Sequence, residues 1–258
     1  MTTGSAIRLW ALEPATYRSP AQIASLGDAA PRIPFPVYAV EHAEGLVLFD
    51  AGLDPDHAGN PAGAYGDLAA RIDMDFREEH LIENQLAAIG FAVADVSTVV
   101  ASHLHFDHAG GLKRFAQAPT IVGAGELEYA RAPEKFARTW FRDEDFADRH
   151  GIAWHEISAD HDVFGDGSVT ALALPGHTPG SLALQVRLPS RTIVLSGDVL
   201  HSRGALEAET AYAGDVDSRA ARASLRRLKQ ILDEERADLW IAHDPDDWHG
   251  FGGTGSTP

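Results

Sequence analysis

The feature that most constrains the fold of this chain is the stretch "SHLHFDHAGG", which follows an apolar run. Within six positions it carries His103, His105, Asp107 and His108. The preceding run, "DVSTVVASH" (95–103), is short and rich in β-branched residues, which is typical of a buried strand. Side chains at i and i+2 of an extended segment point the same way, so His103 and His105 would face one site. Imidazole and carboxylate groups are metal ligands, and imidazole suits zinc, iron, copper and nickel.

Three further apolar runs also end on a residue that can bind a metal. The runs "SVTALALPGH" (168–177), "TIVLSGDVL" (192–200) and "DLWIAHD" (238–244) carry, in that order, His177, Asp198 and His243. A buried aspartate without a partner is costly, so Asp198 should have a cation nearby. The chain has 13 histidines, so one strand that ends on a ligand-type residue could arise by chance, but four such strands are not expected by chance. The pattern therefore predicts a metal site where several strands end.

Composition narrows the classes of function. The 258 residues suit one large domain or two small ones, and an apolar fraction of 45% is ordinary for a globular protein. The net charge of -17 argues against nucleic acid or an anionic membrane as partner. Cysteine is absent, which excludes disulfides, thiolate ligands and a cysteine nucleophile. We see neither a signal peptide nor a membrane helix, so we expect a soluble cytoplasmic protein.

Helices separate several of the expected strands, which favours an α/β layered domain. We expect further strands at 6–12, 36–42, 45–52, 120–125 and 181–188, and helices at 78–90 and 217–237. Residues 53–77 are rich in Gly, Pro and Asp and should form a loop over the domain. Residues 131–150 should form short helices, either as a lid or pocket wall or as an insertion packed on the core. The last residues, 250–258, are typical of a frayed tail.

These residues also carry a resemblance to a known family. The stretch "SHLHFDHAGG" matches the HxHxDH signature of the metallo-β-lactamase superfamily, and "GHTPGS", "SGD" and "AHD" follow in the order of that superfamily. The stretches "VYAVEHAEGLVLFDAGL" and "IENQLAAIGF" resemble its N-acyl-homoserine lactonase branch. The resemblance covers the chain from Leu9 to His243. It implies one αββα sandwich domain, 1–258, with two mixed sheets flanked by helices and a site at one edge between the sheets.

The resemblance implies two divalent metal ions, usually zinc, although iron, manganese and cobalt also suit nitrogen and oxygen ligands. The first metal would be bound by His103, His105 and His177. The second would be bound by Asp107, His108 and His243, with Asp198 bridging both. Asp50, in "LFDAGL", would orient a metal-binding histidine from outside the ligand set.

The activity that the resemblance implies is metal-dependent hydrolysis of a carboxylic ester bond. A bridging hydroxide would open a lactone ring, with N-acyl-homoserine lactone as the leading substrate and quorum quenching as the biological role. Asp107 would hold the proton of the nucleophile and pass it to the leaving group. Homoserine lactonases have a tyrosine three residues after the bridging aspartate, where this chain has His201. Imidazole can donate a hydrogen bond or act as a general acid, but His201 could equally be a bystander.

This departure keeps other substrates open, among them other lactones (the pyridoxolactone type), aryl esters and the thioesters of glyoxalase II-like enzymes. A di-iron redox protein is a less favoured alternative, because flavodiiron relatives usually have glutamate where His105 stands. A metal-binding protein without activity is disfavoured by the complete ligand set. We expect no nucleic-acid or membrane partner, and a monomer or a homodimer.

Several other residues have less specific interpretations. Phe106, Trp140 and Phe141 are candidate substrate contacts, with core packing as the alternative, and the same holds for Tyr65 and Phe76. The remaining histidines have no ligand partner in register and are expected to lie outside the metal site: His42, His57, His80, His150, His155, His161 and His249.

Overall fold

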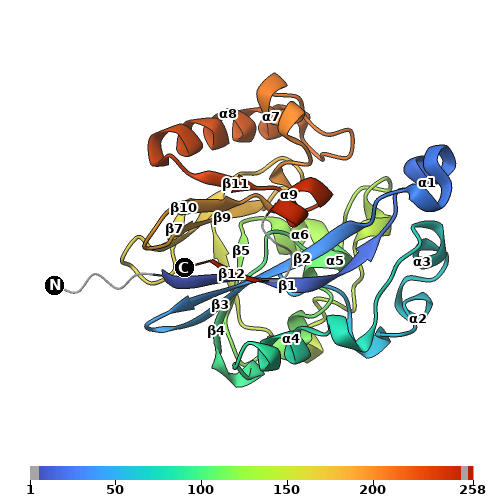
Figure 1. Ribbon diagram of the computed structural model, residues 1–258, viewed down its shortest axis with the longest axis horizontal. Helices are drawn as coiled ribbons and strands as arrows, with labels where there is room; N and C mark the ends of the chain where they lie inside the picture. Colours follow the sequence, from blue (N-terminus) through green and yellow to red (C-terminus); the bar gives the residue numbers. More distant parts are fainter. Residues whose placement is uncertain (1–5, 251–254, 258) are drawn as a thin grey trace.

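The computed structural model describes residues 6–250 and 255–257, and these form two β-sheets packed face to face between helices (Figure 1). One sheet has seven strands in the order β12-β1-β2-β3-β4-β5-β6, and the other has five in the order β11-β10-β9-β8-β7. Helix α8 covers the outer face of the five-stranded sheet, and α4 lies on the outer side of the seven-stranded sheet (Figure 1). The αββα fold that the sequence predicts is confirmed.

The seven-stranded sheet is mixed. Strands β1, β2 and β3 pair antiparallel, whereas β3, β4, β5 and β6 pair parallel. Because parallel strands end at the same edge of a sheet, the segments that follow β3 and β4 lie side by side. The strands are β1 (Ala6–Tyr17), β2 (Ile33–His42), β3 (Gly45–Phe49), β4 (Val96–Val100), β5 (Thr120–Gly123), β6 (Trp154–Ile157) and β12 (Gly255–Thr257).

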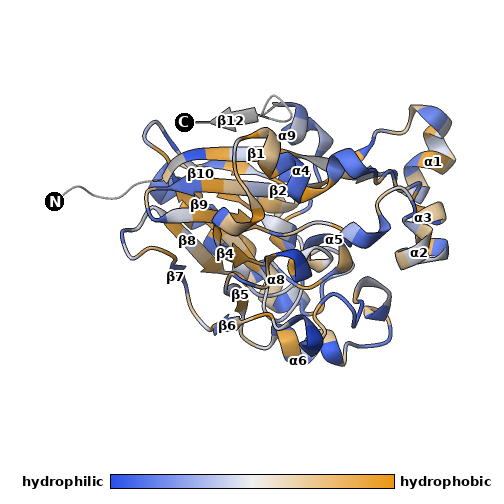
Figure 2. Ribbon diagram, turned by 90° about the horizontal axis from the view of Figure 1, so that it is seen from below, coloured by the Kyte–Doolittle hydropathy of each residue, from blue (hydrophilic) through white to orange (hydrophobic). Residues whose placement is uncertain are grey.

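The five-stranded sheet is also mixed, since β10 and β11 pair parallel and its other neighbours pair antiparallel. Its strands are β7 (His161–Asp162), β8 (Val169–Ala173), β9 (Leu182–Arg187), β10 (Thr192–Leu195) and β11 (Asp238–Trp240). Apolar residues are concentrated on the strands, as Figure 2 shows by colour. Phe49, Leu184 and Leu195 belong to the buried cluster that joins the two sheets.

The helices are short except for α8 (Ser218–Glu235), whose first turn is capped by the Asp217 carboxylate accepting from the backbone N–H groups of Arg219 and Ala220. Leu225 and Leu228 on its inner face pack against the five-stranded sheet. The other helices are α1 (Pro20–Leu26), α2 (Ala62–Tyr65), α3 (Asp67–Arg71), α4 (Ile82–Ala88), α5 (Phe106–Ala109), α6 (Glu126–Arg131), α7 (Arg203–Ala208) and α9 (Pro245–Gly250). In the described part of the chain, none of them has both the length and the apolar character of a membrane span.

The structure differs from the sequence-based expectations at several segments. Residues 53–77 contain α2 and α3 as well as loop, and β6 and β7 were not expected. The interpretation of 250–258 as a frayed tail is wrong for Gly255–Thr257, which pair with Leu9–Ala11 of β1. The backbone hydrogen bonds of this edge strand come from a segment far away in the sequence, so local composition gives no sign of them. The tail residues 251–254 and 258 lie outside the described residues.

Candidate metal centre

The signature stretch lies at the carboxyl end of β4. His103 and His105 follow the strand, with His105 on extended backbone, and α5 then begins at Phe106, so Asp107 and His108 lie on its first turn. The turn packs closely on the segment after β3, where the backbone N–H of Ala51 donates to the carbonyl oxygen of His108. Parallel pairing of β3 with β4 thus fixes where these side chains lie.

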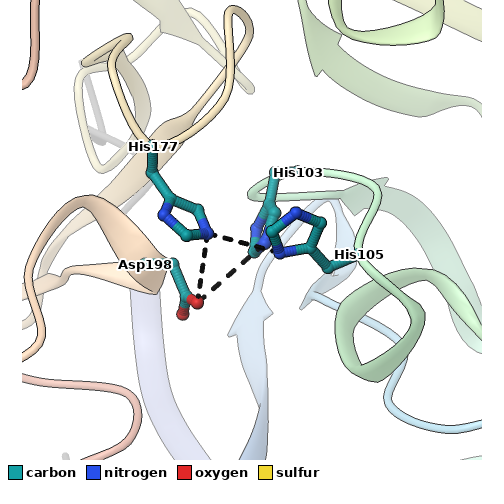
Figure 3. Close-up of side chains that lie close together, drawn as sticks. All are labelled: His103, His105, His177 and Asp198. Atoms are coloured by element: carbon teal, nitrogen blue, oxygen red, sulfur yellow. Dashed lines mark hydrogen bonds and ion pairs between the residues drawn. The ribbon is translucent and has the colours of Figure 1, made fainter. Parts of the chain in front are cut away.

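The other sheet supplies the remaining ligand-type residues. His177 lies on the loop between β8 and β9, Asp198 on the turn after β10, and His243 after β11. Figure 3 shows His177 and Asp198 approaching from one side and His103 and His105 from the other, with their side chains pointing toward a common centre. The site therefore lies between the two sheets, at the edge where their strands end.

The seven side chains form two adjoining clusters. The ligand atoms of each cluster lie within 4.8 Å of one another; the clusters are His103, His105, His177 and Asp198, and Asp107, His108 and His243. The two oxygens of Asp198 face different clusters. Its Oδ2 is 3.5 Å from Nε2 of His177, and its Oδ1 is 3.1 Å from Nε2 of His243. Asp198 thus has the geometry of a carboxylate shared by two ions.

The site has the donor chemistry that a metal pair needs. Six of the seven residues are buried, and the side chain of the seventh, His243, is 9% exposed. Nε2 of His103 is buried and has no hydrogen-bond partner among the described residues. An unpartnered buried nitrogen is costly, and a cation bound at the cluster would remove that cost. The residues present therefore fit two divalent ions.

The electrostatics of the first cluster favour the ligand forms of its groups, whereas in the second cluster the carboxylates of Asp107 and Asp198 outweigh burial and raise the pKa of His108 and His243. Burial lowers the pKa of His103 and His105 well below the usual value for histidine, and neighbouring imidazoles lower it further. Both rings are therefore neutral and can bind a metal. Burial by itself would raise the pKa of Asp198, but His243 and His108 hold it well below its usual range. Asp198 is consequently ionised.

Asp50 lies directly behind the second cluster. Its Oδ2 is 2.8 Å from Nδ1 of His108, and its carboxylate accepts hydrogen bonds from the backbone N–H and the hydroxyl of Ser102. The residue has a φ of 67°, a left-handed conformation that aspartate tolerates better than most residues. The carboxylate on Nδ1 leaves Nε2 of His108 directed at the cluster, which is the geometry that an orienting role requires.

Two further acidic residues support the first cluster, and sequence reasoning missed both. Oδ1 of Asp215 is 3.1 Å from Nδ1 of His177. The buried carboxylate of Glu126 accepts from the backbone N–H groups of Leu104 and Gly180, so it joins the segments that carry His105 and His177. Neither residue lies at a strand end with a ligand-type neighbour, and we find no sequence signal that would have found them.

A cavity of about 710 Å³ opens above the clusters. His201 lies in its wall, with Nε2 3.4 Å from Oδ2 of Asp198 and its ring stacked on Tyr212 at 4.2 Å between centroids. Tyr17, at the end of β1, also lines the cavity. Sequence reasoning singled out His201 but neither tyrosine, because their segments have no motif and reach the site only through the fold.

The candidate substrate contacts are divided between the cavity and the core. Phe106 and Trp140 line the cavity, whereas Phe141 is buried and packs edge-on against His105, with 4.6 Å between ring centroids. Tyr65 and Phe76 pack with Phe106 in a buried cluster beside the cavity. Among the described residues, neither metal cluster includes any of His42, His57, His80, His150, His155, His161 and His249.

Two mixed sheets with adjoining His/Asp clusters at their shared edge define a metalloenzyme of the αββα class. The chain belongs to the metallo-beta-lactamase superfamily, whose family model matches residues 36–237. It is 35% identical over 225 residues to the N-acyl homoserine lactonase AttM of Azorhizobium caulinodans, covering 85% of each chain. It is 33% identical over 254 residues to the AttM lactonase of Rhizobium radiobacter, covering 95% of this chain and 96% of the relative.

Solved structures of the same fold include an N-acyl homoserine lactone hydrolase with the product N-hexanoyl-L-homoserine bound at its catalytic metal centre. That structure matches with a TM-score of 0.81 and 25% identity, covering 95% of this chain and 96% of the other. The resemblance that the sequence motifs indicate is confirmed by these matches.

Proposed function

We propose that this protein is a metal-dependent lactonase that hydrolyses N-acyl homoserine lactones and uses two zinc ions. The observation that carries the proposal is the pair of adjoining clusters, joined by Asp198, beneath a cavity of about 710 Å³. The names of the relatives and the bound product of the solved hydrolase support the same substrate class.

His103, His105 and His177 would hold one ion, Asp107, His108 and His243 the other, and Asp198 both. Zinc is the metal we favour, because neutral imidazole and carboxylate oxygens are its usual ligands in a chain without cysteine. When bound, a pair of such ions lowers the pKa of water and polarises a carbonyl oxygen.

The side chains around the clusters then have distinct tasks in ester hydrolysis. Water adds to the lactone carbonyl carbon, the ring C–O bond breaks, and the product is a hydroxy acid. We assign Asp107 to the proton: its Oδ2, which lies 3.5 Å from Nε2 of His243, would take the proton of the attacking water and return it to the ring oxygen as that oxygen leaves.

His201 would donate a hydrogen bond to the substrate from the position that a tyrosine occupies in the homoserine lactonases that this chain resembles. Its Nε2 is at the edge of the first cluster, and stacking on Tyr212 restricts the orientation of its ring. Imidazole differs from phenol in its charge states near neutral pH, so other lactones, aryl esters or thioesters are the alternative substrates.

A pH-indicator hydrolysis assay on protein of measured metal content tests the proposal. The panel contains N-acyl homoserine lactones of several chain lengths, plain lactones, aryl esters and a glutathione thioester. We expect fast acid release from the N-acyl lactones, abolished by chelation and restored by zinc. Release from aryl esters or the thioester alone would refute the substrate, and inactivity of protein loaded with two ions toward every ester would refute the reaction class.

A further inference from the structure

The cavity contains a tyrosine to which the proposed reaction assigns no task. Tyr17 ends β1, and its ring stacks on Phe35 with 4.7 Å between centroids and 18° between planes. The same ring lies edge-on to His243, at 6.2 Å. No hydrogen bond joins its hydroxyl to any other residue that the structure describes. Tyr17 thus brings a partly buried, unpaired donor to the metal centre from a part of the sequence that carries no motif.

Tyr17 and His201 both lie beside His243, with 6.2 Å and 6.4 Å between ring centroids. His201 lies against the first cluster, with 5.3 Å between its ring and that of His177. Tyr17 lies against His243 of the second cluster. Burial and the charges of Asp107 and Asp198 raise the pKa of the phenol. A phenol hydroxyl is protonated at neutral pH and can donate a hydrogen bond.

Beyond Tyr17 the cavity wall has an apolar part beside the polar residues Ser19, Gln22 and Arg71. Ile33 pairs with Tyr17 in the register of β1 and β2, and Phe35 stacks on it. Both line the cavity, together with Ile72 and Pro20. Tyr17 therefore lies between the polar floor formed by the metal ligands and the apolar part of the wall.

The order of groups in an N-acyl lactone matches this boundary. The ring ester must reach the metal clusters to react, and the alkyl chain gains most by covering the apolar wall. The amide joins the two, so it has to cross the boundary. Moving an amide carbonyl out of water without a new hydrogen-bond donor costs free energy. The unpaired hydroxyl of Tyr17 is a donor at that place.

We propose that Tyr17 is a substrate-binding residue whose hydroxyl donates a hydrogen bond to the amide carbonyl oxygen, so that the enzyme selects N-acylated lactones over plain ones. The inference rests on the proposed function for the position of the ring. It adds to the proposed function that the amide group is what distinguishes the preferred substrates from plain lactones.

Tyr17→Phe tests the proposal with two substrates of similar length. One is N-hexanoyl homoserine lactone, and the other is a γ-alkyl lactone that has the ring and a chain but no amide. The variant keeps the ring that stacks on Phe35 and loses only the donor. We expect kcat/KM for the N-acyl lactone to fall about tenfold, mostly through KM, and kcat/KM for the plain lactone to change by less than about twofold.

Tyr38→Phe is the matched control. Tyr38 is a buried tyrosine of β2 that packs between the sheets and is not among the residues lining the cavity. Removing its hydroxyl should therefore leave the ratio of kcat/KM for the two lactones unchanged. Calorimetry of N-hexanoyl homoserine binding to the zinc-loaded proteins gives a second readout, with about tenfold weaker binding expected for Tyr17→Phe only. Metal content and Tm of both variants should equal those of the wild type.

The outcomes separate this proposal from the proposed function. Equal loss on both lactones, or no loss on either, would overturn the role of Tyr17. A wild type that hydrolyses both lactones equally well would also overturn it while leaving the lactonase reaction intact. If the zinc-loaded wild type hydrolysed neither lactone, the proposed function itself would fail.

Discussion

Two groups of mostly buried ionisable side chains differ in where their counter-charge comes from. The first comprises the two metal clusters, in which His103 keeps a buried nitrogen without a hydrogen-bond partner in the described structure. The second, here called the Asp54 network, comprises Asp54, Asp56, Lys113, Arg142 and Asp145. It holds together the segment after β3, the turn after α5 and the segment 131–150.

The Asp54 network supplies its own cations. Asp54 is fully buried, and its carboxylate is 2.7 Å from Nζ of Lys113 and 3.1 Å from a guanidinium nitrogen of Arg142. It also accepts a hydrogen bond from the backbone N–H of Asp56. Burial by itself would raise the pKa of Asp54, but these partners lower it.

The source of the counter-charge indicates the role of a buried charged group. Around Asp54 the chain provides acceptor and donors together, so this carboxylate serves stability and position. In the metal clusters the chain provides only ligand groups, and the balancing charge has to come from solution. The two groups should therefore respond differently to substitution. Changes in the clusters should lower metal content and activity, whereas changes in the network should lower the free energy of unfolding.

The largest effect is expected at the residue shared by both clusters. Asp198→Asn removes a charge that faces both ions and should lower kcat/KM by on the order of a thousandfold. The number of zinc ions per chain, measured by atomic emission after dialysis, should fall below two. A variant with full activity and half the metal would contradict a reaction that needs both sites.

The next largest effect concerns stability. Asp54→Ala leaves Lys113 without its buried partner and should lower the free energy of unfolding by about 3 kcal/mol, measured by urea titration. Metal stoichiometry should stay at the wild-type value. Loss of metal at unchanged stability would mean that the network belongs to the site rather than to the scaffold.

The same contrast has a pH dependence. Because the folded pKa of Asp54 is lowered, its ionised form contributes stability above the unfolded pKa of about 4 and loses that contribution as pH falls through the folded value. The stability difference between wild type and Asp54→Asn should therefore be present near neutral pH and shrink progressively as pH falls below about 4. A difference that stays constant down to pH 2 would contradict the charge as its cause.

A smaller effect is expected behind the second cluster. Asp50→Asn keeps a side chain that tolerates the left-handed backbone, and removes the negative charge that orients His108. Binding of the second zinc ion should weaken by about 10- to 100-fold, measured by competition with a chelating dye, with little change in Tm of the metal-free protein. Unchanged affinity would show that the ring of His108 is fixed by packing alone.

The smallest effect is expected at Glu126. The side-chain amide of Glu126→Gln has one oxygen, so it can accept from only one of the two backbone N–H groups, at Leu104 and Gly180. Because one of these hydrogen bonds is lost, the zinc affinity of the first cluster should fall about threefold to tenfold. Glu156→Gln is the control, because its exposed carboxylate binds the neighbouring Gly125 N–H. Equal effects of the two variants would remove the special role of Glu126.

The ligand-type residues could be predicted because their signal is local. Each follows a short apolar run, and alternation along an extended segment decides that His103 and His105 point together. The long helix α8 was predictable for the same reason: its leucine stripe and the Asp217 cap lie within one segment. The order of these elements favoured an α/β layered domain, and the family resemblance implied the αββα sandwich.

The sequence by itself thus determined which ligand-type residues follow which strands, and the family resemblance divided them into two sets. Only the tertiary structure decided which groups surround the clusters: Tyr17 arrives from β1, Asp215 reaches His177, and Glu126 joins two separate segments. The physical reason is the range of the interactions. Strand ends and helix faces are set by neighbouring residues, whereas a hydrogen bond between distant segments depends on how two sheets pack, and a single chain carries no local pattern for it.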